Sequence, residues 1–263
     1  MIHPELHTNP VPLDRQQHRL LRVRRDMSDI TRFAALNSSF VVVGEFAEAC
    51  KDYPLVWIHA GTDAKGEAQV APIAVFGLTR QDNLCIDRGT WRTQYLPVVL
   101  RVYPFAMART GDDMWAVCYD ASSQRFSLAD GEALFGADGE PTDFTRDVQK
   151  QLEQVEAEVE RSRQIGRELL RCDLLREMRF EAKLPDGSAI NVEGFLTIDH
   201  ERFGALSDAD VLKLHKNGVL ALIHAHHVSL SNMRRLAQWH VERHGAAPSA
   251  DAARPAAAPP AQP

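Results

Sequence analysis

The 263-residue sequence contains no apolar run long enough to cross a membrane. Arg101 and the histidines at 224, 226 and 227 interrupt the longest candidates, whereas a spanning helix needs about 18 consecutive apolar residues. The first residues also lack the basic and apolar segments of a secretory signal. We therefore expect a protein without a transmembrane segment that is cytoplasmic, with signal-independent export to the cell surface as the alternative.

Cysteine and basic charge are scarce as well. The four cysteines, Cys50, Cys85, Cys118 and Cys172, lie far apart, and no Cys-x-x-Cys pair is present. This pattern excludes a disulfide-rich scaffold and a cysteine-based zinc motif, and it indicates reduced thiols. Lys and Arg total 30 against 36 Asp and Glu, giving a net charge of −6. A field of this sign does not attract nucleic acid, so no nucleic-acid partner is predicted.

The motifs of several common enzyme classes are missing. The sequence has no Gly-x-Gly-x-x-Gly for a dinucleotide and no Gly-x-Ser-x-Gly for a hydrolase serine. Residues Gly61 to Gly66 have the glycine spacing of a phosphate loop, but Glu67 and Ala68 follow where Lys and Ser or Thr are needed. We interpret that segment as a hairpin loop. Cys85 and Cys118 have apolar neighbours, which favours buried thiols over nucleophiles.

The first half of the chain alternates between strand-like runs and turns. β-branched and aromatic residues gather in the runs 40–43, 54–59, 70–78, 83–87, 96–108 and 114–120. Residues 45–51 read as a short helix, and Gly, Asp and Asn separate the remaining runs. Short strands divided by such turns predict an antiparallel, meander-like sheet.

The second half begins with a long amphipathic helix. Thr142 and Asp143 can cap its free amides, and one stripe along it is apolar or small: Leu152, Val155, Val159, Ser162, Gly166 and Leu169. A helix of about 25 to 30 residues with one such stripe either lies across a sheet or pairs with a second chain. Oligomerisation through the 143–170 helix is therefore one possibility for the assembly of this protein.

A hairpin and further helices complete the predicted domain. Residues 178–184 and 190–198 read as its two strands, joined by the turn 185–188. A helix from Ser207 to Asn217 and a second from Val219 to about Val241 follow. The fold class is α+β: a single domain with an antiparallel sheet, one long amphipathic helix, a late β-hairpin and a C-terminal helical pair.

The ends of the chain differ from this domain in composition. We expect a flexible N-terminal arm at 1–14, the folded domain at 15–244, and a tail at 245–263. The tail consists mainly of Ala and Pro without apolar periodicity, which predicts disorder.

Histidine spacing gives the best argument for a metal. His240 and His244 are four residues apart, which is the spacing of zinc-binding helices. Glu242 stands one position late for a metalloprotease motif, and a third ligand would have to come from elsewhere in the chain. We therefore predict no metal and no cofactor.

His226 supports two interpretations. It is either a buried, hydrogen-bonded residue or the centre of an enzymatic site, paired with a carboxylate such as Asp199. His224 and His227 are three residues apart and share a helix face from which His226 points away.

One stretch is rich in aromatic residues and arginine: Trp91, Tyr95, Arg101, Tyr103 and Phe105. Such residues serve as interface hot spots and line ligand pockets, and they also fill cores. Together with His226 they are the candidate residues for binding a ligand or partner, and a protein or peptide is the expected partner.

The chain resembles the SapC-like family of bacterial proteins. The densest matching block runs from Trp91 to Ala106, and other matching residues are spread over about 15–240: His18, Glu45, Tyr53, Pro72, Gly77, Asn83, Phe135, Gly194, Asp199, Ser207, Gly218, His226 and Ser229. His224 and Cys85 depart from the family pattern, which has aromatic residues at both positions.

This resemblance implies a non-catalytic accessory or binding protein. The family is named for association with a bacterial surface layer, and members occur beside outer-membrane receptors and flavin-dependent halogenase-like proteins. A link to the surface layer or to an outer-membrane uptake pathway is thus implied. The alternatives are an enzyme, metal-assisted or partnering such an oxidative system through His226, and a protein that assembles the surface lattice.

Overall fold

Antiparallel pairing organises all the sheets in the residues that the computed structural model describes: 2–26, 30–63, 65–109, 115–183 and 189–245. The largest sheet has the strand order β12-β13-β4-β5-β3. Its strands are β3 (Ser38–Phe40), β4 (Leu55–Thr62), β5 (Ala68–Val75), β12 (Leu175–Lys183) and β13 (Ala189–Ile198). Strand β4, which ends at Thr62, pairs with β5 as expected for a hairpin at this point of the chain, and the expected late hairpin is the β12–β13 pair.

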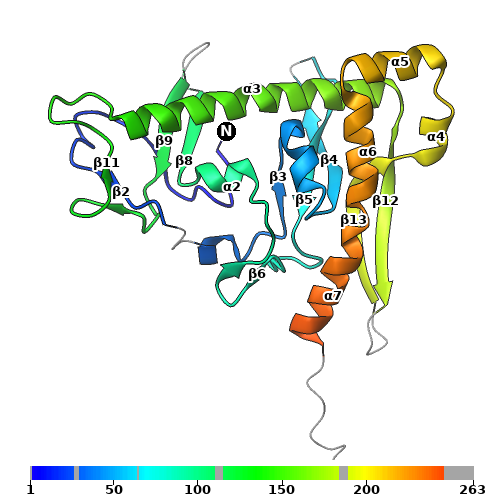
Figure 1. The fold of residues 1–263 in the computed structure, drawn as a ribbon, viewed down its shortest axis with the longest axis horizontal. Coiled ribbons are helices and arrows are strands. Elements are labelled where there is room, and N and C mark those ends of the chain that lie inside the picture. The colour runs from blue at the N-terminus through cyan, green and yellow to red at the C-terminus, as the bar shows by residue number, and fades with distance from the viewer. Residues whose placement is uncertain (1, 27–29, 64, 110–114, 184–188, 246–263) are drawn as a thin grey trace, which may run out of the picture.

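Two smaller sheets lie at the other end of the molecule (Figure 1). One has the order β1-β9-β8, with β1 (Pro10–Pro12), β8 (Phe105–Arg109) and β9 (Trp115–Asp120). The other has the order β10-β2-β11, with β2 (Arg22–Val23), β10 (Phe126–Ser127) and β11 (Glu132–Ala133). A two-stranded ribbon pairs β6 (Ile86–Asp87) with β7 (Thr90–Trp91).

Helix α3 (Asp143–Arg171) connects the two ends of the molecule (Figure 1). Thr142 caps it by accepting the Thr145 amide, as predicted. Its apolar stripe is buried against the chain's own sheets: Leu152 joins the core of the smaller sheets, and Ile165 and Leu169 join the main core. At Gly166 an added Cβ would lie 3.0 Å from Val70, so glycine lets the helix approach β5 closely. The sheet-covering alternative for this helix is therefore confirmed.

The N-terminal residues expected as an arm pack against the body. Leu6 is fully buried, and β1 pairs with β9 from Pro10 opposite Asp120 to Pro12 opposite Cys118. Further along, Val23 of β2 is also fully buried, whereas Leu20 is exposed. Leu6 thus anchors the start of the chain in the main core, whereas Val11, Leu13 and Val23 pack in the core of the smaller sheets.

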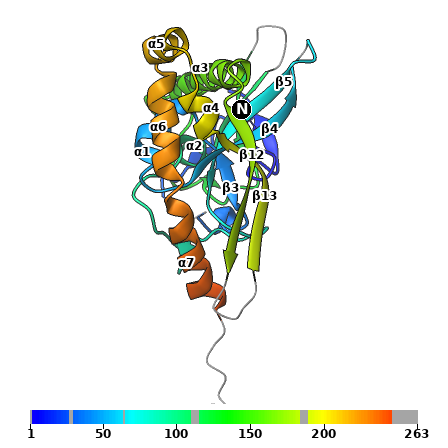
Figure 2. The same ribbon diagram turned by 90° about the vertical axis from the view of Figure 1, so that its right-hand side faces the viewer.

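The C-terminal half adds α4 (His200–Gly204), α5 (Asp208–Lys216), α6 (Val219–Ser229) and α7 (Asn232–His244). Helices α6 and α7 follow one another beside the β12–β13 hairpin (Figures 1 and 2). The single helix expected over 219–241 is therefore interrupted. The Ser229 hydroxyl donates to the His226 carbonyl at 2.6 Å, and a serine bonded in this way disturbs the helical ladder.

Two expected strands are wrong in part. The run 96–108 contains helix α2 (Val98–Val102) before β8 begins; Pro97 precedes the first helical residue, where proline is tolerated, and buried Glu45 accepts the Val98 amide. The run 40–43 ends as a strand at Phe40 and continues into a 3₁₀ turn (Val43–Glu45) and helix α1 (Phe46–Ala49). A second 3₁₀ turn covers Ile30–Phe33.

The expected α+β fold, with its antiparallel sheets, long helix and late hairpin, is confirmed. Among the described residues, no helix combines the length and the apolar character that crossing a bilayer requires. The expected hairpin turn at 185–188 and residues 246–263 of the predicted tail lie outside the described residues.

Candidate functional site

The residues predicted to form one binding surface are divided by the structure between the surface and two cores. Tyr95 is half-buried and Arg101 exposed, whereas Tyr103, Phe105 and His226 are no more than 4% exposed. Trp91 is half-buried as well, so Trp91, Tyr95 and Arg101 form the part of the predicted set that a partner can reach.

A buried carboxylate fixes Tyr95. Glu45 is 6% exposed and accepts the Tyr95 hydroxyl at 2.7 Å and the amide of Val98, the first residue of α2, at 2.6 Å. The Tyr95 amide in turn donates to Asp52 Oδ2 at 2.8 Å. Burial raises the pKa of Tyr95, and its hydrogen bond to Glu45 raises it further, so the hydroxyl keeps its proton. Tyr95 is thus fixed by hydrogen bonds at its backbone amide and at its side-chain hydroxyl.

Arg101 lies over this ring. Its guanidinium carbon is 5.5 Å from the ring centroid of Tyr95, and Nη2 donates to the Tyr95 hydroxyl at 3.4 Å. A cation over an aromatic face is attracted by the ring quadrupole. Within the part of the chain that the structure describes, Arg101 forms no ion pair with a carboxylate. Most of its donors therefore face solvent.

Trp91 connects Tyr95 and Arg101 to the main core. Its indole Nε1 donates to the Tyr53 hydroxyl at 2.9 Å, and its ring meets Phe76 edge to face at 5.4 Å. Tyr53 is fully buried and donates to the Tyr95 carbonyl. The aromatic residues beneath Tyr95 are therefore part of the main core, and they restrain the loop that carries it.

Tyr103 and Phe105 follow α2 in the chain and are buried in different cores. The Tyr103 hydroxyl donates to Asp120 Oδ2 at 2.9 Å, and Arg32 pairs with the same oxygen at 3.3 Å. Burial acts to raise the pKa of Asp120, but hydrogen bonds from Ser122, Asn9 and Tyr103 outweigh it and keep the pKa low. Phe105 packs on other aromatic rings in the second core. Phe105 therefore joins the two smaller sheets, whereas Tyr103 lies in the main core and bonds to the end of β9.

His226 lies in a dry apolar environment. It is 1% exposed, its Nε2 accepts the Ile198 amide at 3.1 Å, and the space beside it does not admit a water molecule. Burial lowers its pKa to about 4, and the neighbouring His227 acts in the same direction. Asp199, its suggested partner, instead caps α4 by accepting the amides of Glu201 and Arg202. The interpretation of His226 as buried and hydrogen-bonded is confirmed.

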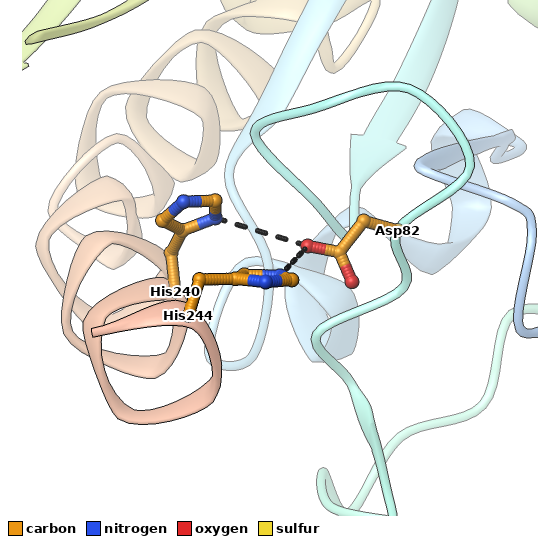
Figure 3. A group of neighbouring side chains, drawn as sticks. All are labelled: Asp82, His240 and His244. Atoms are coloured by element: carbon orange, nitrogen blue, oxygen red, sulfur yellow. Dashed lines mark hydrogen bonds and ion pairs between the residues drawn. The ribbon is translucent and has the colours of Figure 1, made fainter. Parts of the chain in front are cut away.

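His240 and His244, the pair spaced four residues apart, lie next to the carboxylate of Asp82. Figure 3 shows His240 and His244 of α7 pointing toward Asp82, which lies on the loop between β5 and β6. His244 Nε2 is 2.8 Å and His240 Nδ1 is 3.7 Å from Asp82 Oδ2. Burial lowers the pKa of His240, so its ring is neutral near pH 7. Burial acts to raise the pKa of Asp82, but hydrogen bonds from His244 and Arg243 outweigh it and lower the pKa. Asp82 is therefore the carboxylate that the fold places beside this histidine pair.

Two of the cysteines are buried, as their apolar neighbours predict. Cys85 is fully buried and Cys118 is 2% exposed. Burial raises the pKa of Cys85 to about 12 and also raises that of Cys118. Both remain thiols near neutral pH, so neither has the character of a nucleophile.

A groove that the sequence does not indicate lies between α3 and the β8–β9 pair. It has a volume of about 610 Å³, and its apolar lining includes Leu13, Met107 and Trp115. Trp115 is 51% exposed, and Glu153 and Glu156 of α3 also line the groove. Its walls come from segments far apart in the sequence, so no local pattern marks them as one surface.

A model of the SapC family matches residues 13–236. This match covers most of the 263 residues, so the chain belongs to the SapC family, and the resemblance seen in the sequence is confirmed. No match was found among curated proteins or among solved structures.

Proposed function

We propose that this protein is a non-catalytic accessory protein that binds an acidic segment of a protein partner through Tyr95 and Arg101. The observation that carries the proposal is the exposed guanidinium of Arg101, placed over a tyrosine ring whose hydroxyl is held by buried Glu45. Tyrosine and arginine dominate the binding energy of many protein interfaces. An anchored pair loses less conformational entropy when a partner binds.

The chemistry of Arg101 specifies the partner. A guanidinium offers donors in a planar fork that fits a carboxylate with two parallel hydrogen bonds. Because no described carboxylate pairs with Arg101, most of these donors are available for Asp, Glu or a C-terminal carboxylate of a partner. The net charge of −6 would repel an acidic partner at long range, so we expect such a contact to be local.

Site-specific cross-linking in cells that naturally express the protein tests this proposal. A photoreactive residue replaces exposed Gln94, next to Tyr95, and a second variant carries it at exposed Lys216 on α5. A partner captured from position 94 but not from 216 is then purified, and its affinity is measured by calorimetry. We expect Arg101→Ala to weaken binding about 30-fold, the size of a strong interface contact.

Matched variants separate this surface from others. Arg234→Ala removes another exposed arginine, on α7, and leaves affinity unchanged if the contact is specific. Trp115→Ala tests the groove under α3. Loss of binding in Trp115→Ala with full binding in Arg101→Ala would reject the Tyr95–Arg101 surface and assign the partner to the groove.

The wider setting of this function is also a proposal. A role beside the surface layer or an uptake receptor requires part of the protein at the cell envelope, and fractionation with an antibody tests it against a cytoplasmic location. A lattice-assembly role requires self-association, which sedimentation measures. An enzymatic role for His226 is not favoured, because its side chain is 1% exposed and the space beside it admits no water.

A further inference from the structure

We propose that Asp82, His240 and His244 form a binding site for a divalent transition metal, with zinc the best fit, which clips helix α7 to the loop before β6. Their candidate ligand atoms all lie within 4.8 Å of one another (Figure 3). Among the described residues, no other group of three such side chains meets this condition. This inference is independent of the Tyr95–Arg101 surface.

The donor set suits zinc. Two imidazole nitrogens and one carboxylate oxygen are a common set of three protein ligands, with water in the fourth position. Ligand atoms at about 2.0–2.1 Å from a tetrahedral zinc are about 3.3 Å apart. The two separations from Asp82 Oδ2, 2.8 Å to His244 and 3.7 Å to His240, lie on either side of that value. A metal would replace the proton that His244 Nε2 shares with the carboxylate.

His240 supplies an independent observation. The residue is only 6% exposed to solvent. Its Nδ1 nevertheless has no hydrogen-bond partner, and it faces Asp82. Buried polar atoms nearly always have a partner, because an unpaired one costs about 1–3 kcal/mol. A metal bound between Nδ1 and the carboxylate would satisfy this nitrogen.

The loop that presents Asp82 is held in one conformation. Gln81 has a φ of +57°, which non-glycine residues adopt infrequently and which recurs at functional sites. The Asp82 carbonyl lies so close to Gly77 that an added Cβ there would be 1.7 Å away. Arg243 donates to Asp82 Oδ1 at 2.7 Å and leaves Oδ2 to face the histidines. Outer contacts of this kind orient metal-binding carboxylates.

The same geometry argues against a metalloprotease. Glu242, the acidic residue within the His-x-x-x-His segment, pairs with Arg92 at 3.1 Å and accepts from Gln238 at 2.9 Å. These contacts engage both of its oxygens away from the histidines. The site thus has ligands without an adjacent base, which suits a clip more than a hydrolytic centre.

Calorimetry on the full-length protein, stripped of metal with a chelator and titrated with Zn²⁺, tests the proposal. We expect one Zn²⁺ per chain, at least tenfold weaker binding in His244→Ala and Asp82→Asn, and unchanged binding in His215→Ala, which removes an exposed histidine of α5. His244 is exposed at the end of α7, so its loss leaves the fold intact, as circular dichroism of the metal-free protein would verify.

Two further readouts locate the metal. X-ray absorption of the zinc complex should show two imidazoles and an oxygen ligand, and hydrogen exchange should slow in residues 79–83 and 236–244 when zinc is added. Absence of stoichiometric binding would overturn the site. So would wild-type affinity in both His244→Ala and Asp82→Asn, which would mark any bound zinc as adventitious.

Discussion

Helices α6 and α7 each bury one histidine, and the two differ in what surrounds it. His226 of α6 is 1% exposed among apolar side chains and accepts a backbone amide. His240 of α7 is 6% exposed. Both rings have an Nδ1 without a hydrogen-bond partner, but only that of His240 faces a carboxylate, Asp82. Both rings are neutral near pH 7 because burial lowers their pKa values. The difference teaches that burial alone does not make a histidine structural; the groups facing its free nitrogen decide its role.

The variant His226→Asp tests most strongly whether His226 lies in apolar surroundings. A carboxylate at this position would be buried without a partner, so we expect a loss of about 3–5 kcal/mol in the free energy of unfolding. The matched variant His224→Asp changes an exposed residue of the same helix and should cost less than about 0.5 kcal/mol. Urea denaturation measures both. Equal losses in the two variants would show that His226 is not in a dry site.

Acid titration tests the same contrast without placing a new charge in the core. The folded pKa of His226 is about 4, against about 6.5 when unfolded, so the unfolded chain binds the proton first. Its contribution is complete above pH 6.5 and is lost as the pH falls toward 4, by about 3 kcal/mol in total.

The variant His226→Leu isolates this contribution from that of the other histidines. Leucine leaves the Ile198 amide unsatisfied, which lowers stability at every pH by about 1–3 kcal/mol. The stability of His226→Leu should nevertheless fall less steeply between pH 6.5 and 4 than that of the natural protein. Parallel stability curves over this interval would contradict the low pKa of His226.

For His240 of α7, the test is whether the loop that carries Asp82 holds the carboxylate in place. In Gly77→Ala the new Cβ would collide with the Asp82 carbonyl, so we expect about 1–3 kcal/mol of destabilisation and weaker Zn²⁺ binding. Gly204→Ala is the control, because no atom lies within 4 Å of its added Cβ and its φ is negative. Unchanged stability in Gly77→Ala, measured by urea denaturation, would mean that the loop adapts and does not fix the carboxylate.

Sequence patterns correctly predicted those helices and strands that depend on interactions between residues close in the chain. The spacing of apolar residues and the cap at Thr142 identify α3, and two strand-like runs separated by the turn residues 185–188 identify the β12–β13 hairpin. They failed at 96–108, where residues of high strand propensity form α2 after Pro97: the fixed φ of proline is compatible with a helix start, and a tertiary contact, the bond from the Val98 amide to Glu45, overrides a weak strand propensity.

The sequence predicted only some of the residues in each candidate site. The spacing of His240 and His244 marks one helix face, but Asp82 looked like an ordinary turn residue. Similarly, Tyr95 and Arg101 stood out as interface residue types, whereas Glu45, which holds Tyr95, was notable only through the family resemblance. Each missing residue comes from a distant segment that the fold brings alongside.

The sequence by itself determined the secondary structure that depends on periodicity, the absence of common nucleotide and hydrolase motifs, and the family. Only the tertiary structure decided which side chains meet. Asp82 reaches His244 across 162 positions, and Glu45 reaches Tyr95 across 50. Periodicity reports which face of an element is apolar, whereas a site depends on how faces of separate elements pack. That packing, settled by burial over the whole chain, makes one histidine of this protein a core residue and another a candidate ligand.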